Sequence, residues 1–244
     1  SRAERLFVGL NSGVLDQSCV SFCLKNQLLY LDTDIQQYQF QNFGAAGPGG
    51  ALPFKIVIFY SGVTRSLTTT DYNLRVQECR TAANLLLNYE GKNVDLAHSL
   101  LRDASRQTFD KYAAVMPPRY ARRARHFFSE CERVRQGLEA WRQGEVEQFG
   151  ELMFESCESS ILNYECGSPE LIALYRSLRH TPGVYGARFC GAGFIGSCFA
   201  LVAPDAVDEV RSQVTADYLR EFPMYKDTFR TFVCDSHNGM EFVE

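Results

Sequence analysis

The spacing of apolar residues over residues 1–60 predicts a helix followed by strands. Over 13–24 the apolar residues recur at helical intervals. We expect strands at 27–33, 35–43 and 54–60, and the last of these is β-branched and aromatic, which is typical of a buried strand. The glycine- and alanine-rich run over 43–51 predicts a flexible loop before that strand.

The middle of the chain has the spacing of amphipathic helices. Thr70 or Asp71 can cap a helix over 72–88, and Pro117-Pro118 opens the longest predicted helix, which extends to about residue 143. The apolar positions of that long helix recur alternately after four and three residues and predict one buried seam, at Tyr120, Ala124, Phe127, Cys131, Val134, Leu138 and Trp141.

Two further helices are expected after Gly144, which breaks the long helix. The first covers 145–163, with Val146, Phe149, Met153 and Cys157 facing inward. The short connection at Gly144 predicts that it packs antiparallel to the long helix. The second begins at Ser168-Pro169, because serine is a favoured cap and proline fits the first helical position.

The last third of the chain returns to strands. We expect strands over 184–189 and 197–203, joined by a glycine-rich turn, then an amphipathic helix from 205 to about 222 and a closing strand over 229–234. Strands and one helix that follow a mostly helical block are typical of the α+β fold class.

Length and composition favour a globular protein without a membrane span. The 244 residues can bury a sizeable core in one large domain or two smaller ones. No run of 18 apolar residues exists, and the N-terminus does not resemble a signal or transit peptide, so we expect a cytoplasmic protein that does not span a membrane. The chain lacks an initiator Met, and we expect it to be a fragment or a processed form.

Charge and the metal-ligating residue types narrow the function. A net charge of −4 argues against a nucleic-acid surface, so the six arginines between Arg119 and Arg135 are expected on a solvated face beside Glu130, Glu132 and Glu139. The nine cysteines include no C-x-x-C pair, and the four histidines stand apart. We therefore expect reduced cytosolic thiols and no metal site built by this chain.

The run Gly186–Cys198 carries the most specific local signal. Four glycines fall within eleven residues, and such a turn can present backbone N–H groups to an anion, or it can be a tight hairpin that needs glycine for its geometry. Its Gly191–Gly196 portion matches G-x-G-x-x-G. A dinucleotide-binding fold needs a helix directly after this motif, whereas a strand is predicted there, which argues against that fold. The other motifs of protein kinases are absent from the sequence, which argues against a protein kinase.

Two other segments combine residues that can act on a ligand. Asp16 lies near the start of a predicted helix, where it is either an ordinary first-turn acid or a carboxylate that acts on a hydroxyl nucleophile. The segment 61–79 joins hydroxyls, Arg65, Tyr72 and Arg75 at a strand-to-helix junction. Such junctions often face ligands, although capping by Thr70 or Asp71 explains part of the same pattern.

Taken together, the three segments resemble the galactokinase branch of the GHMP kinase superfamily. Its motifs G-x-x-C-G-x-x-D-Q, S-L-x-x-x-x-Y-x-x-R-x-x-x-C and G-x-R-x-x-G-x-G-F-G-G correspond here to segments ending at Gln17, Cys79 and Gly196. The resemblance implies the two-domain GHMP kinase fold within the α+β class. It implies the rear part of the N-terminal domain over 1–66 and a complete ferredoxin-like C-terminal domain with added helices over 67–244.

Within that branch, the strings 72–75, 163–167 and 182–189 resemble the galacturonokinases of plants and algae. The resemblance implies transfer of the ATP γ-phosphate, with Mg²⁺, to the anomeric hydroxyl of galacturonate. It implies that Asp16 is the catalytic carboxylate and that the substrate is bound by Gly13, Tyr72, Gly191, Ala192 and Gly193. A bidentate arginine is the natural partner of the uronate carboxylate, so Arg65, Arg75 and Arg188 are its candidate readers.

Departures from the family pattern limit what this chain is expected to do alone. Ser12 stands where galactokinases have Cys, and Ile195 stands where the glycine loop has Gly, so we expect no close backbone approach at Ile195. The family's sugar-recognition motif and its P-x-x-x-G-L-S-S-S phosphate loop belong before Asp16 and are not in these residues. The resemblance therefore implies that the chain alone binds ATP poorly and catalyses little.

Two other functions are compatible with the same motifs. A related kinase for galactose or arabinose would carry the same motifs, and a non-catalytic sugar or nucleotide sensor on the same fold would need no turnover. The intact Asp16 favours an enzyme. The expected partners are a small sugar acid and ATP, with no nucleic acid and no membrane, and the sequence does not give the oligomeric state.

Overall fold

The computed structural model describes residues 4–9, 11–64 and 70–240. Its helices are α1 (Leu15–Phe22), α2 (Tyr72–Tyr89), α3 (Arg106–Tyr112), α4 (Pro118–Gln143), α5 (Val146–Ser159), α6 (Pro169–His180) and α7 (Val207–Glu221). Its strands are β1 (Gln27–Asp32), β2 (Gln37–Asn42), β3 (Lys55–Tyr60), β4 (Val184–Phe189), β5 (Ser197–Val202) and β6 (Arg230–Cys234). These elements confirm the predicted α+β class, and α3 is an element that the sequence pattern did not predict.

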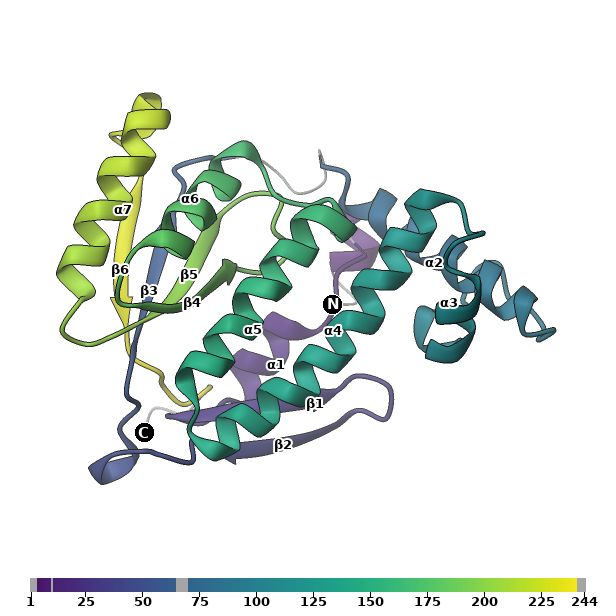
Figure 1. Cartoon of the computed structure of the whole chain (residues 1–244), viewed down its shortest axis with the longest axis horizontal. Coiled ribbons are helices and arrows are strands. Elements are labelled where there is room, and N and C mark those ends of the chain that lie inside the picture. Colours follow the sequence, from purple (N-terminus) through teal and green to yellow (C-terminus); the bar gives the residue numbers. More distant parts are fainter. Residues whose placement is uncertain (1–3, 10, 65–69, 241–244) are drawn as a thin grey trace.

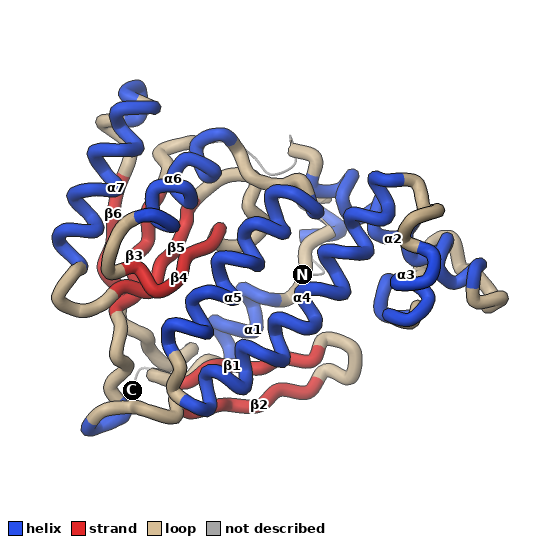
Figure 2. Tube along the Cα trace, viewed as in Figure 1, coloured by secondary structure: helices blue, strands red, loops and turns tan. Residues whose placement is uncertain are grey.

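The strands form two separate sheets (Figure 2). The larger one is antiparallel with the order β4-β5-β3-β6, so strands far apart in the chain lie side by side, with Phe59 opposite Cys198. Its buried residues pack with α6 and α7 into a core that includes Val57, Leu174 and Val214. This core fixes the end of β4, from which the glycine-rich turn begins.

The smaller sheet is the β1–β2 hairpin, which is attached to the end of α4. Trp141 donates a hydrogen bond from Nε1 to the carbonyl of Gln41 at 3.0 Å, and its ring packs edge-on against Phe43 with centroids 5.0 Å apart. Arg142 also donates from Nε to Oε1 of Gln41 at 2.9 Å. The residues that follow β6 reach the same region, where Gly239 donates its backbone N–H to the carbonyl of Cys23.

Helices α4 and α5 run side by side through the centre of the molecule, joined at Gly144 in the left-handed conformation (Figure 1). This arrangement confirms the predicted pair. The predicted seam of α4 is wrong in its middle, because Cys131 is exposed and Val134 is 51% exposed. The α4 face there borders an open groove rather than a packed helix, and the buried positions shift to residues such as Phe128 and Ala140.

Helix α5 approaches the larger sheet unusually closely at a pair of glycines. A Cβ on Gly150 would lie 2.0 Å from the carbonyl oxygen of Tyr185, and one on Gly186 would lie 2.4 Å from the Cα of Gly150. Such separations are shorter than any van der Waals contact, so only glycine permits this approach. The contact holds α5 against the strand that leads to Arg188.

A second apolar core lies between α2, α3 and α4. Ala82 and Leu86 of α2, Phe109 of α3 and Ala124 of α4 are buried in it. This core, to which α4 contributes Ala121, Ala124 and Phe128, is separate from the one beneath the sheet. Figure 1 shows α2 and α3 on the far side of α4 from the sheet.

The predicted division of the chain after residue 66 stays a prediction. The pairing of β3 bears on it, because β3 precedes residue 66 while its partners β5 and β6 follow it. A division before β3 would keep the larger sheet in one unit. Among the described residues, no helix combines the length and the apolar character needed to cross a membrane.

Candidate active site

A cavity of about 380 Å³ lies where α1, α2, α4 and the end of β4 meet. Residues from five segments line it: Ser12, Gly13, Leu15, Asp16, Gln17, Tyr72, His126, Ser160, Tyr164, Cys166, Arg188, Phe189, Gly191 and Ala192. The three segments singled out in the sequence therefore meet on one cavity. The predicted residues Gly13, Asp16, Tyr72, Arg188, Gly191 and Ala192 are all among the lining residues.

Asp16 reaches the cavity from the first turn of α1. Its side chain is exposed, and a carboxylate in a first helical turn is stabilised by the helix dipole. Burial and the nearby Asp16 carboxylate together raise the pKa of the Cys190 thiol in the glycine-rich turn. Asp16 and the residues Gly191 and Ala192 of that turn line the same cavity.

Tyr72 and the glycine-rich turn face each other across the site. The Tyr72 ring contacts Phe194 with centroids 6.2 Å apart, and its hydroxyl donates to the carbonyl of Asn11 at 3.5 Å. Gly193 does not line the cavity. It has φ of +75°, and a Cβ there would lie 2.6 Å from the Phe189 ring, so its role is to let the turn fold back over β4.

Arg188 supplies a positive charge to the cavity. Its Nη1 donates to Oγ of Ser156 at 2.8 Å and lies 3.9 Å from a carboxylate oxygen of Glu130. Ser156 in turn donates to Glu130 at 2.7 Å. Arg188 also lines an adjacent, mostly apolar groove between β1, α4 and α5, so it stands at the boundary of the two spaces.

His126 is a lining residue that the sequence did not single out. Its Nδ1 lies 2.9 Å from Oγ of Ser159, and its ring contacts Tyr164 with centroids 4.9 Å apart. Burial lowers the pKa of His126 to about 4, so the imidazole is neutral at pH 7. No local pattern marked this histidine, because only the tertiary fold brings it beside Tyr164.

Two other titratable groups on the cavity wall, Cys166 and Tyr164, are uncharged at neutral pH. Burial raises the pKa of the Cys166 thiol to about 11, and it raises the pKa of the Tyr164 phenol as well. Asp16 and Arg188 are therefore the charged side chains among the described lining residues. One carboxylate and one guanidinium among neutral polar groups suit a hydroxylated ligand of the size of a sugar.

Of the other two predicted carboxylate readers, Arg65 lies outside the described residues, and Arg75 does not line the cavity. Arg75 is 8% exposed, and its donors reach Glu78 at 3.0 Å, Asp71 at 3.3 Å and the carbonyl of Glu165. A guanidinium held in this way has its donors directed at the protein. The structure therefore leaves Arg188 as the described candidate.

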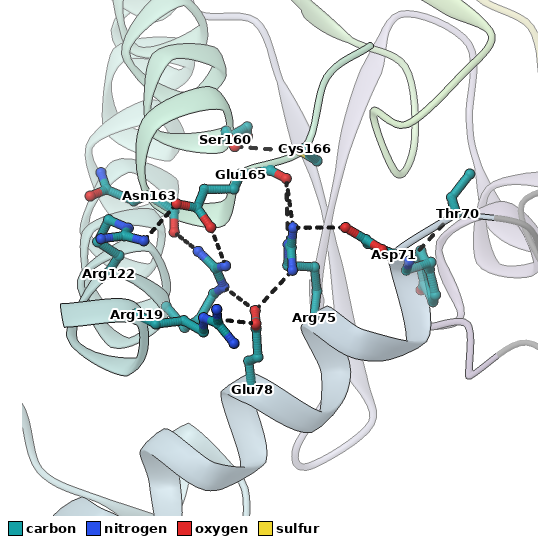
Figure 3. A network of polar contacts seen from close by, with 12 residues as sticks. Thr70, Asp71, Arg75, Glu78, Arg119, Arg122, Ser160, Asn163, Glu165 and Cys166 are labelled. Carbon is teal, nitrogen blue, oxygen red and sulfur yellow. Dashed lines mark hydrogen bonds and ion pairs between the residues drawn. The ribbon is translucent and has the colours of Figure 1, made fainter. Parts of the chain in front are cut away.

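Arg75 belongs to a polar network that lies beside the cavity (Figure 3). Its centre is Arg123 of α4, which is fully buried and donates to Glu78 at 2.7 Å and to Glu165 at 2.5 Å. The prediction of a solvated arginine face is wrong for this residue. The helical spacing could not reveal that two carboxylates, from α2 and from the turn after α5, converge on Arg123.

The described residues contain no group of three His, Cys, Asp or Glu side chains that could hold a metal ion. At the cavity, Asp16 is the sole carboxylate among the lining residues. This donor set does not fit a resident Mg²⁺, which prefers several oxygen ligands in octahedral geometry.

The chain is similar to kinases of small molecules. Residues 137–220 match the family described as GHMP kinases C terminal. A galacturonokinase from Arabidopsis thaliana is 40% identical over 223 residues, which cover 91% of this chain and 51% of that protein. A galactokinase from Limosilactobacillus reuteri is 33% identical over 218 residues, covering 89% of this chain and 53% of that protein.

A solved structure gives the same picture for the fold. The crystal structure of Lactococcus lactis galactokinase complexed with galactose superposes with a TM-score of 0.83 and 28% identity, covering 98% of this chain and 58% of that one. The chain thus spans about half the length of the curated relatives that it matches.

Proposed function

Because the chain belongs to the GHMP kinase superfamily, we propose that the full-length protein containing it is an ATP-dependent sugar-1-kinase. The reaction would transfer the γ-phosphate of ATP to the anomeric hydroxyl of D-galacturonate and give galacturonate 1-phosphate. The observation that carries the proposal is the meeting of Asp16, Tyr72 and the glycine-rich turn on one cavity of about 380 Å³. These segments are far apart in the sequence.

In this proposal Asp16 acts on the nucleophile. Its carboxylate holds the 1-hydroxyl and accepts the proton as the bond from the sugar oxygen to the γ-phosphorus forms. The bond from that phosphorus to the bridging oxygen breaks, and ADP leaves. Tyr72 and Gly13 contact the sugar, and the backbone of Gly191 and Ala192 lies against the sugar-phosphate side of the cavity. Gly193 makes no direct contact with the sugar in this proposal, because it packs on Phe189.

ATP is the proposed phosphoryl donor, and Mg²⁺ is expected to arrive with its phosphates. The described cavity itself offers this metal one carboxylate only, that of Asp16. The 244 residues alone are expected to turn over little, since the phosphate loop that the resemblance implies is not among them. A cytoplasmic location and the lack of nucleic-acid and membrane partners stay predictions.

The proposed substrate is galacturonate because of Arg188. This guanidinium lines the cavity and can pair with a uronate carboxylate, which a neutral sugar lacks. A galacturonokinase at 40% identity supports the same choice. Galactose is the second candidate, because the galactokinase that superposes at a TM-score of 0.83 is a complex with galactose. Arabinose is a third neutral sugar for comparison.

A substrate panel tests the sugar. The full-length protein is given ATP, Mg²⁺ and galacturonate, galactose or arabinose, and the anomeric phosphate is followed by phosphorus NMR. We expect kcat/KM for galacturonate to exceed that for either neutral sugar by about tenfold or more, the effect of one charge-assisted contact. A neutral sugar that is used better than galacturonate would overturn this choice, and the absence of any sugar phosphate would overturn the kinase proposal.

The variant Arg188→Gln tests the residue that reads the carboxylate. We expect it to lower kcat/KM for galacturonate about tenfold to a hundredfold and to leave kcat/KM for any neutral sugar within about threefold. Arg133→Gln is the matched control, because Arg133 also pairs with Glu130 but lines only the adjacent groove. Equal losses in the two variants would contradict a contact between Arg188 and the substrate.

A further inference from the structure

The network around Arg123 ties three segments of the chain together beside the cavity. Arg75 and Arg123 both donate to the same oxygen of Glu78, at 3.0 and 2.7 Å. Arg123 also donates to Glu165, which belongs to the turn after α5. Figure 3 shows Arg75 and Glu78 pointing from α2 toward Glu165, with Arg122 of α4 on its other side.

The turn at Glu165 is held in a conformation that its sequence does not favour. Glu165 has φ of 57° and ψ of 47°, the left-handed region that costs a residue with a Cβ of order 1 kcal/mol. Its carboxylate accepts from Arg122 and Arg123 at 2.6 and 2.5 Å, and its carbonyl accepts from Arg75 at 3.3 Å. Arg123 further donates to the carbonyl of Asn163.

These contacts act on the wall of the cavity through the two neighbours of Glu165. Tyr164 and Cys166 both line the cavity, and Tyr164 packs against His126. Since a side chain follows its backbone, any change in the conformation of Glu165 moves both lining residues. The same network fixes α2 a single turn after Tyr72, which also lines the cavity.

Stability alone is a weak explanation for such a network. Arg123 is fully buried and Glu78 is 4% exposed, and removing two charges from water costs about as much as their attraction returns. The hydrogen bonds from Arg123 hold Glu165 ionised and lower the pKa of its carboxylate. Arg123 donates in three fixed directions, to Glu78, Asn163 and Glu165, and these hydrogen bonds define a geometry that apolar packing does not.

We propose that Arg75, Glu78, Arg123 and Glu165 are positioning residues that set the sugar-facing wall of the cavity by fixing the turn 163–166. They touch no substrate themselves. Their effect runs through Tyr164, Cys166 and the first turn of α2. This inference rests on the proposed function for its ligand, a hydroxylated sugar, but the position of the turn can be measured without any ligand.

The test uses Glu165→Gln in the full-length protein, with two readouts. The first is the pKa of His126, followed by NMR of the imidazole. A displaced Tyr164 would expose His126 to water, so we expect that pKa to rise from about 4 by roughly one unit or more. Arg123, Arg133, Arg188 and Glu130 also act on this histidine and remain in place. The second readout is the Kd for galacturonate, which we expect to increase about tenfold.

The matched control is Glu151→Gln. Glu151 pairs with both terminal nitrogens of Arg179 at 2.6 and 2.7 Å and does not line the cavity, so it loses the same charge and the same kind of contact. We expect it to leave both readouts unchanged. Arg122→Gln is a milder second variant, because it keeps Arg123 paired with Glu165, and we expect a smaller change in the same direction should Glu165→Gln fail to fold.

A lower melting temperature for Glu165→Gln, with the His126 pKa and the sugar Kd both unchanged, would overturn the inference and leave a purely structural network. Equal changes in Glu151→Gln would overturn it too. A wild-type protein that binds no sugar would refute the proposed function instead, and the His126 titration would then decide the positioning claim by itself.

Discussion

His126 illustrates how the fold sets the chemistry of one side chain at the cavity. Burial and the charges of Arg133, Arg188 and Arg123 lower its pKa to about 4, against the opposing effect of Glu130. The imidazole is therefore a neutral hydrogen-bonding group next to Tyr164 and not a cation. A neutral group suits a cavity that already holds the positive charge of Arg188.

This depressed pKa makes folding stability depend on pH. Below pH 6.5 the unfolded chain binds a proton at His126 and the folded chain does not, so the free energy of unfolding falls as the pH falls from 6.5 toward 4. We expect a loss of about 2 kcal/mol over this window that is absent from His126→Gln. Urea unfolding at pH 6.5, 5.5 and 4.5 measures it.

The difference in the free energy of unfolding between the wild type and His126→Gln at each pH isolates the contribution of His126. Carboxylates such as Glu151 and Glu165 have lowered pKa values and lose their contribution only as the pH falls below about 4.5. His98→Gln serves as the control, because His98 is exposed and its pair with Asp95 contributes little. Parallel curves for wild type and His126→Gln would show that His126 is not buried as described.

At the scale of residues, the sequence located part of the cavity and missed the rest for a physical reason. Asp16, Tyr72 and Gly191 lie in segments whose composition is unusual, and the resemblance of those segments to family motifs singled them out. His126 and Glu165 lie in helical or turn sequence with ordinary composition. Their importance arises from neighbours more than 30 residues away in the chain, such as Ser159 for His126, and these contacts leave no local pattern.

At the scale of elements, the contact between α5 and β4 holds the strand that carries Arg188 and Phe189 to the cavity. Gly150 and Gly186 touch backbone to backbone, and β4 then continues directly to Arg188 and Phe189. A side chain at either glycine would push the helix off the strand. The position of Arg188 therefore depends on the backbone contact between Gly150 and Gly186.

Gly150→Ala tests this contact. The added methyl group would meet the Tyr185 carbonyl, so we expect the free energy of unfolding to fall by about 1–3 kcal/mol, as for an overpacked core, and the galacturonate Kd to rise with it. Gly137→Ala is the matched control within α4, where the nearest atom would lie at 3.5 Å. That change should be neutral or stabilise by up to about 1 kcal/mol, because alanine favours helices.

Chemical denaturation of both variants gives the answer. Equal unfolding free energies for Gly150→Ala and the wild type would mean that α5 does not lie against β4 in this way. A destabilised Gly137→Ala would mean that the two glycines cannot be told apart by their surroundings.

The elements themselves were largely predictable, and their arrangement was not. The strand at 184–189 has the predicted bounds and the helix begins after Ser168 as predicted, because helix capping and the glycines that flank a strand act locally. The α4 seam was wrong at Val134, since a helical stripe does not reveal whether a partner covers it. The order β4-β5-β3-β6 depends on pairing between distant strands, which no local signal encodes.

For the whole molecule, the predicted GHMP kinase fold is confirmed by the superposition with galactokinase at a TM-score of 0.83. The family motifs predicted this fold, whereas the periodicity of apolar residues predicted only the α+β class. Three apolar cores among the described residues and a central pair of helices bring residues 12–17, Tyr72 and the glycine-rich turn to one cavity. We propose that this cavity is the phosphoryl-acceptor site of the full-length protein.

The most direct test of that claim is Asp16→Asn in the full-length protein. Asparagine keeps the size of the side chain but cannot accept the proton of the sugar hydroxyl. Asp208→Asn is the control, because Asp208 is likewise a first-turn acid, in α7, and does not line the cavity. We predict that Asp16→Asn lowers kcat for galacturonate phosphorylation by about a hundredfold or more, while the galacturonate Kd stays within about threefold. A kcat for Asp16→Asn within a few-fold of the wild-type value would contradict the proposed role of Asp16 as the group that accepts the proton.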